Sequence, residues 1–157
     1  MRALAAGLWL LSATAATACD VPVFSCDVGA KRLSICLTGE TLTYSFGPSG
    51  APELLIDTDL SRLDYIPWAG VGRHLFESVR LRNGDYTYEV WHSLDRLDPD
   101  ATLEGGVIVF QGDDTLAELS CTPRTARGDL YTLFVAIEAT GRCFDLNTRT
   151  WGACNGG

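Results

Sequence analysis

The amino-acid sequence predicts a mainly β fold, a small antiparallel barrel or sandwich of about eight strands with one C-terminal helix. Short runs in which apolar and polar residues alternate follow one another at close spacing, and glycine-containing turn signals separate them. A late segment changes to helical periodicity. The chain has 157 residues, 46% of them hydrophobic, and residues 19–157 contain no repeat or linker. We therefore expect residues 19–157 to form a single disulfide-bonded, β-rich domain.

The first four predicted strands lie in the N-terminal third of the chain. Val23–Val28 and Arg32–Thr38 flank the turn signal Gly29-Ala30-Lys31. Thr41–Phe46 alternates between apolar and polar residues, which favours a half-buried strand. Glu53–Asp57 is a fourth, weaker candidate, so this part of the chain predicts four consecutive strands.

The clearest unit is a hairpin in which Arg73–Arg82 and Asp85–Ser93 flank Asn83-Gly84. Asn-Gly is a strong hairpin signal because both turn positions tolerate a positive φ. A two-residue loop predicts that Arg82 lies opposite Asp85, with His74 and His92 on opposite faces, where they cannot share a metal ion or a catalytic dyad. The face that we expect to enter the core carries Leu75, Glu77, Val79 and Leu81 together with Tyr86, Tyr88, Val90 and His92.

A second hairpin follows, with Gly106–Gln111 and Thr115–Ser120 around Gly112-Asp113-Asp114. The tail, residues 142–157, carries little secondary-structure signal, and we expect Cys143 and Cys154 to hold it.

The periodicity changes after Pro123 and predicts a helix over Leu130–Thr140. Asp129 can cap the start of this helix and Gly141 can end it. A strand is the alternative, because aromatic and β-branched residues such as Tyr131 and Val135 lie in the segment.

The N-terminus has the features of a secretory signal peptide over residues 1–18. Arg2 precedes a short apolar run, and Ala16-Thr17-Ala18 forms a small-residue cleavage site. We therefore expect a periplasmic or secreted protein that begins at Cys19 and has no transmembrane segment. A lipid anchor at Cys19 is the alternative. It is disfavoured because Ala16 stands where such anchors usually have leucine, and because lipidation would leave one thiol without a partner.

Six cysteines in an exported chain predict three disulfides, although the sequence does not choose among the pairings. A metal site is not expected, because the chain has no Cys-x-x-Cys and neither histidine lies within five residues of a cysteine. No cofactor motif is present either. The cysteines are Cys19, Cys26, Cys36, Cys121, Cys143 and Cys154.

The net charge is −8, and a chain beginning at Cys19 carries −9 because only Arg2 is lost. Such a charge disfavours nucleic-acid binding. It favours a basic partner protein, because opposite charges speed association.

Candidate binding residues gather around the main hairpin. Glu77 and His92 are expected as diagonal neighbours on its core face, either as an acid–base pair lining a pocket or as a satisfied structural pair. The preceding glycine-rich loop carries Tyr65, Trp68 and Arg73, and it is either a recognition surface or a plug for the core. Trp91 is expected on the other face of the hairpin.

No catalytic motif is present in the sequence, so an enzyme is not favoured.

Short motifs resemble the membrane-bound inhibitor of C-type lysozyme family. They are a Cys26–Cys36 hairpin, a Gly105–Cys121 hairpin that ends in cysteine, and Ser49-Gly50-Ala51, which is similar to the family's Ser-Gly-Ala loop. The resemblance implies a disulfide-supported barrel that blocks a lysozyme cleft, with Ser49 in contact with the enzyme. The sequence departs from the family at Pro52, near which the family has tyrosine, and it lacks the family's inserted lysine.

Together these features predict an exported binding protein whose partner is a basic protein, such as a lysozyme-like cell-wall hydrolase. A small-ligand or carbohydrate-binding barrel that uses Tyr65, Trp68 and Trp91 is the first alternative. An exported hydrolase that depends on carboxylates, with Glu77 and His92, is the second.

Overall fold

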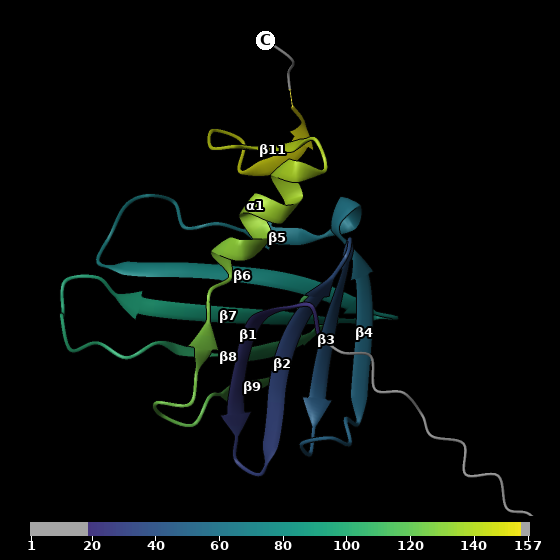
Figure 1. The fold of residues 1–157 in the computed structure, drawn as a ribbon, viewed down its shortest axis with the longest axis vertical. Coiled ribbons are helices and arrows are strands. Elements are labelled where there is room, and N and C mark those ends of the chain that lie inside the picture. The colour runs from purple at the N-terminus through teal and green to yellow at the C-terminus, as the bar shows by residue number, and fades with distance from the viewer. Residues whose placement is uncertain (1–18, 155–157) are drawn as a thin grey trace, which may run out of the picture.

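A computed structural model describes residues 19–154, and it is mainly β, as the sequence predicts. Two five-stranded antiparallel sheets hold most of the chain (Figure 1). All eight predicted strands are present. Four further strands of two to four residues each, β5, β10, β11 and β12, were not predicted. The predicted signal peptide, residues 1–18, lies outside the described residues.

The first sheet contains the N-terminal strands in the order β10-β1-β2-β3-β4. Its faces follow directly from the alternation in the sequence. Leu33 and Ile35 of β2 are buried, as are Leu42 and Tyr44 of β3. The bounds are Val21–Val28 for β1, Lys31–Thr38 for β2, Thr41–Gly47 for β3, Leu54–Asp59 for β4 and Arg127–Gly128 for β10.

The second sheet has its strands in chain order, β5-β6-β7-β8-β9. A short 3₁₀ helix, Leu60–Arg62, joins it to the first sheet. The bounds are Asp64–Ile66 for β5, His74–Asn83 for β6, Tyr86–Asp95 for β7, Glu104–Gln111 for β8 and Asp114–Ser120 for β9.

The two sheets pack face to face, and their strands cross in Figure 1. The rings of Tyr44 and Tyr88 lie 5.6 Å apart across this contact. Phe24 of β1 lies so close to β8 that a Cβ on Gly105 would come within 2.6 Å of its ring. The strand pairings among residues 19–154 do not join the two sheets into a closed barrel.

The register of the main hairpin differs by two residues from the prediction. Arg82 pairs with Thr87 rather than with Asp85, because the turn consists of Gly84 and Asp85 instead of Asn83 and Gly84. Gly84 has a φ of +60°, and a two-residue turn of type II′ places glycine first. Since side chains alternate with a period of two, the shift leaves every residue on its predicted face.

The predicted helix is confirmed as α1, Tyr131–Ala139. The Asp129 side chain accepts a hydrogen bond from the Tyr131 backbone N–H over 2.9 Å, as expected of a capping residue. Leu133 and Ile137 are fully buried and anchor the helix to the core.

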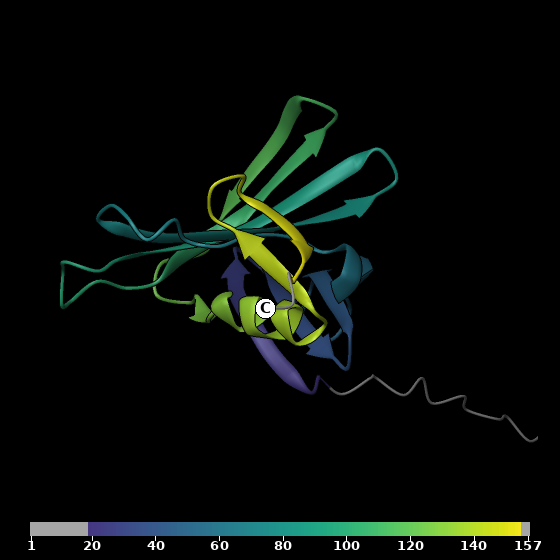
Figure 2. The same ribbon diagram turned by 90° about the horizontal axis from the view of Figure 1, so that it is seen from above.

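The tail, for which the sequence predicts no element, contains two short strands, and Cys143 and Cys154 hold it as expected. Arg142–Asp145 (β11) and Thr150–Ala153 (β12) form a hairpin. The Trp151 Nε1–H donates to the Tyr65 carbonyl over 2.7 Å, which ties the hairpin to β5. Alternation is hard to detect in strands of four residues, so hydrophobic periodicity does not predict them. The hairpin and α1 lie above the ends of β1–β4 (Figures 1 and 2).

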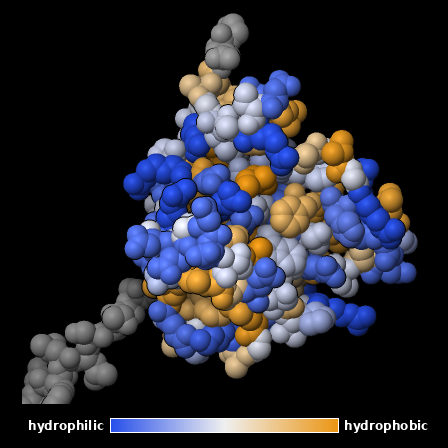
Figure 3. All heavy atoms as spheres, turned by 180° about the vertical axis from the view of Figure 1, so that it is seen from behind, coloured by the Kyte–Doolittle hydropathy of each residue, from blue (hydrophilic) through white to orange (hydrophobic). Residues whose placement is uncertain are grey.

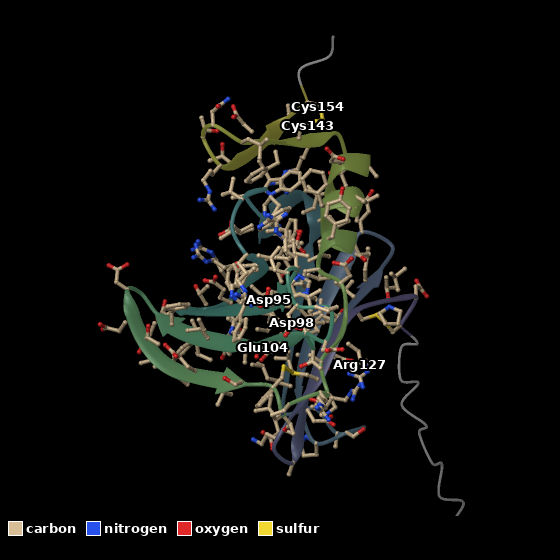
Figure 4. The ribbon with its side chains drawn as sticks, turned by 90° about the vertical axis from the view of Figure 1, so that its left-hand side faces the viewer. Asp95, Asp98, Glu104, Arg127, Cys143 and Cys154 are labelled. Carbon is tan, nitrogen blue, oxygen red and sulfur yellow. A yellow bond between two sulfur atoms is a disulfide. The ribbon has the colours of Figure 1, made fainter. Side chains whose placement is uncertain are left out.

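All six cysteines form disulfides, as the sequence predicts. Cys26–Cys121 links β1 to the end of β9, and Cys143–Cys154 closes the terminal hairpin (Figure 4). Cys19 is bonded to Cys36, which links the start of the described chain to β2. No helix among residues 19–154 is long and apolar enough to cross a membrane.

The disulfide between the sheets should contribute more to stability than the terminal one. Cys26 and Cys121 are separated by 95 positions, and Cys143 and Cys154 by 11. Loop entropy predicts a loss of about 4–5 kcal/mol in the free energy of unfolding for Cys26→Ala/Cys121→Ala. The same model gives about 3 kcal/mol for Cys143→Ala/Cys154→Ala. Urea unfolding followed by circular dichroism measures both, and an equal or larger loss for the terminal pair would contradict this ranking.

Candidate functional site

A pocket opens between the core face of the second sheet and the start of α1. It measures about 370 Å³. Leucines and aromatic rings form most of its wall, and the charged side chains of Glu77, His92 and Asp129 also line it. The lining residues are Trp68, Leu75, Glu77, His92, Leu94, Leu103, Gly128, Asp129 and Tyr131.

A second pocket, of about 340 Å³, adjoins the first. The two pockets share Trp68, Glu77 and Tyr131 as lining residues. Phe134 and Phe144 extend the apolar wall toward the terminal hairpin. The shared residues make the pair one continuous apolar site with Glu77 in common.

The charged pair in the first pocket joins β6 to β7. Glu77 and His92 lie directly opposite each other rather than diagonally, because of the two-residue shift in register. Glu77 Oε2 and His92 Nε2 are 2.9 Å apart, and the two residues are only 7% and 6% exposed. The hydrogen bond gives Glu77 Oε2 and His92 Nε2 a partner where water has little access.

Two buried polar atoms beside this pair have no hydrogen-bond partner among the described residues. They are His92 Nδ1 and the Tyr65 hydroxyl. Burial, together with the nearby Glu77 carboxylate, raises the pKa of Tyr65 well above its usual range, so the phenol stays protonated. A buried polar group without a partner costs about 1–3 kcal/mol. The site therefore retains hydrogen-bonding capacity that the protein does not use.

Asp129 is the site residue that sequence reasoning missed as a ligand. The sequence assigned it only a capping role, yet one ligand atom each from Asp129, Glu77 and His92 lie within 4.8 Å of one another. Gly128 brings it there, with a φ of +106° and a backbone so close to β1 that a Cβ would lie 2.1 Å from the Val23 carbonyl. A glycine directly before a capping aspartate was the one local signal. One imidazole and two carboxylates are also ligands that zinc accepts.

The structure brings some of the predicted binding residues together and separates others. Trp68 lines both pockets with Glu77, whereas Tyr65 is a buried residue of β5 that lies beside Glu77 but lines neither pocket. Arg73 instead forms an exposed ion pair with Asp95. Trp91 lies on the other face of the sheet, stacked on Phe76 with ring centroids 6.2 Å apart. Ser49 is exposed in the loop between β3 and β4 of the first sheet.

An acidic hollow of about 320 Å³ lies at the end of β7 and includes Asp95, Asp98 and Glu104 (Figure 4). Its carboxylates mostly stabilise the loop itself. Asp95 accepts hydrogen bonds from Arg73 and from the Leu97 backbone N–H, and the Arg73 contact holds its pKa below the usual range. Asp98 accepts from the Asp100 N–H over 3.0 Å.

Comparisons of the chain with protein-family models, with curated proteins and with solved structures found no match. The fold and the site define a disulfide-bonded β protein with an apolar pocket and a buried acid–base pair. The geometry of that pocket therefore carries the functional argument.

Replacing one member of the buried pair should strongly destabilise the protein. His92→Phe leaves the Glu77 carboxylate buried without its partner, and we expect a loss of about 3–5 kcal/mol in the free energy of unfolding. Adding Glu77→Leu removes the stranded charge, so the double variant should be more stable than His92→Phe alone. Chemical denaturation of the native chain, of His92→Phe and of the double variant measures these free energies of unfolding.

The same substitution at an exposed histidine is the control. His74→Phe, on the opposite face, should change the free energy of unfolding by less than about 0.5 kcal/mol. A double variant less stable than His92→Phe would show that the pair is not the cause.

Proposed function

We propose that this chain is an exported binding protein and that its ligand is a small molecule held in the first pocket. The observation that carries the proposal is a buried, hydrogen-bonded acid–base pair in the wall of an otherwise apolar pocket. Pockets that bind small molecules are typically apolar with a few convergent polar groups. Three disulfides support a periplasmic or secreted location, as does the signal-peptide pattern of residues 1–18.

The pocket's size and lining indicate the class of ligand. A volume of about 370 Å³ suits a small molecule with an apolar body and one polar group. Leucine side chains would contact the body, while Glu77 and His92 would face the polar group. A carbohydrate fits less well, because Trp91 is on the other face of the sheet and only Trp68 and Tyr131 contribute aromatic rings to the lining of the first pocket.

We interpret the two crossing sheets as a sandwich that holds this site at one end.

The pocket favours binding over catalysis. Serine, threonine and cysteine, the commonest hydroxyl and thiol nucleophiles, are absent from its lining. A carboxylate-dependent hydrolase would use the same Glu77, but it would convert the bound molecule into a product instead of only holding it.

One face of the molecule lacks a continuous apolar patch. On the face turned away from the viewer in Figure 1, hydrophilic groups interrupt the apolar ones (Figure 3). A stable apolar interface with another protein usually needs a continuous patch.

A neutral apolar fluorophore tests the pocket. We expect N-phenyl-1-naphthylamine to bind saturably at one molecule per chain, with an increase in its fluorescence. Leu103→Trp should abolish binding because the larger side chain fills the first pocket. Leu97→Trp is the control, because Leu97 is exposed and outside both pockets. Equal binding by both variants, or none by the native chain, would refute the proposal.

A basic protein partner is the second candidate, and the exposed Ser49 turn is the observation that favours it. The Ala51 N–H donates to the Pro48 carbonyl over 3.0 Å, which holds Ser49 and Gly50 at the tip of a tight turn. A lysozyme cleft is a partner that such a turn could enter, as the sequence resemblance implies. The net charge of −9 would speed association with a basic enzyme.

Inhibition of a purified C-type lysozyme tests this second candidate. We expect stoichiometric inhibition that weakens as salt rises. Ser49→Arg should abolish it by placing a bulky cation at the tip. Ser61→Arg adds the same charge at the opposite end of β4 and should leave inhibition intact. Full lysozyme activity at low salt, in excess of the native chain, would exclude this role.

A further inference from the structure

We propose that Glu77, His92 and Asp129 bind a divalent ion of the zinc type at the first pocket. The three residues come from β6, from β7 and from the residue pair before α1, so the tertiary fold assembles them. One ligand atom from each lies within 4.8 Å of the others. The inference concerns the wall of the proposed ligand pocket, but it does not depend on an organic ligand.

The distances require only small side-chain movements. In a tetrahedral centre with bonds of about 2.0–2.1 Å, two ligand atoms lie about 3.3 Å apart. Glu77 Oε2 and His92 Nε2, at 2.9 Å, would separate by about 0.4 Å as the ion replaces the proton between them. Asp129 is exposed, and its ligand atom, within 4.8 Å of the other two, would have to move inward by at most about 1.5 Å to reach this separation. Its Oδ1 accepts from the Tyr131 N–H, and its other oxygen remains for the ion.

Charge favours a dication at this position. Glu77 and Asp129 place two carboxylates around one small space, and each carboxylate is a ligand that a divalent ion accepts. A divalent ion cancels both charges. The exposed acidic loop near Asp98 differs, because its lining has no buried imidazole.

The Tyr65 hydroxyl is an independent indication. It is buried and lies beside Glu77, whose carboxylate is positioned to accept its hydrogen bond. Metal-binding carboxylates are usually held by a further hydrogen bond, and the phenol can donate one to the Glu77 oxygen that faces away from the ion. Tyr65 would then be a positioning residue.

The donor set selects the ion. One imidazole nitrogen and two carboxylate oxygens suit Zn²⁺, Co²⁺ or Mn²⁺. Ca²⁺ and Mg²⁺ are disfavoured, because they prefer a shell made of oxygen ligands alone. Three protein ligands leave at least one coordination position open toward the pocket, where an oxygen donor of a bound molecule could complete the shell.

Calorimetric titration of the oxidised, exported chain with ZnCl₂ tests the site, with MgCl₂ and CaCl₂ in parallel. We expect one Zn²⁺ per chain and no comparable binding of the other two ions. Asp129→Asn should raise the Kd for Zn²⁺ by more than about tenfold, the size of effect seen when a ligand's hydrogen-bond partner is lost. His92→Gln should abolish binding, and Tyr65→Phe should weaken it by about tenfold.

Asp98→Asn is the matched control. Like Asp129, Asp98 is an exposed aspartate whose Oδ1 accepts the N–H two residues on, so it tests charge and loop effects without a metal role. Its Kd should equal that of the native chain. Asparagine at position 129 retains the side-chain oxygen that accepts the Tyr131 N–H, so Asp129→Asn should fold. This variant therefore tests the metal site even if His92→Gln fails to fold.

Absence of Zn²⁺ binding, or binding that Asp129→Asn leaves unchanged, would overturn the proposal. N-phenyl-1-naphthylamine binding measured in EDTA reports on the pocket separately. A chain that binds the fluorophore but no Zn²⁺ refutes only the metal site, and the converse refutes only the small-molecule proposal.

Discussion

Phe24 of β1 packs against the backbone of β8 at Gly105, and this contact fixes the distance between the two sheets. A side chain on Gly105 would force the sheets apart. Cys26, two residues further along β1, is bonded to Cys121 just beyond β9, so a covalent link holds the same contact. The ring of Phe24 also meets His92 edge to face, with centroids 6.1 Å apart. The packing that joins the sheets therefore also orients a residue of the candidate site.

The same strand positions the third member of that site. β10 pairs with β1 beside Phe24, and Gly128 can lie there because it has no side chain. The next residue, Asp129, thus reaches the wall of the pocket while it caps α1. The pairing of β10 with β1 accordingly adds a second carboxylate to the pocket wall beside Glu77. Surface loops contribute the rim, chiefly through Trp68.

Local pattern was enough to predict the long strands and the faces of the main hairpin. Alternation in β6 and β7 placed Glu77 and His92 on the core face, and the structure confirms this. The register was wrong, because Asn-Gly was read as the turn whereas Gly84 and Asp85 form it. Strands of two to four residues depend on tertiary contacts rather than on their own pattern. Asp129 could not be assigned to the site, because it meets Glu77 only through the pairing of β10 with β1.

The disulfide pattern has a consequence for how the chain matures. Cys19 is bonded to Cys36, although Cys26 lies between them in the sequence. Cys26 is bonded instead to Cys121, 95 positions further along the chain. A chain that emerges from its N-terminus presents Cys19 and Cys26 together long before Cys121 arrives. If Cys19 and Cys26 were oxidised to each other first, reaching the native pairing would require thiol–disulfide exchange.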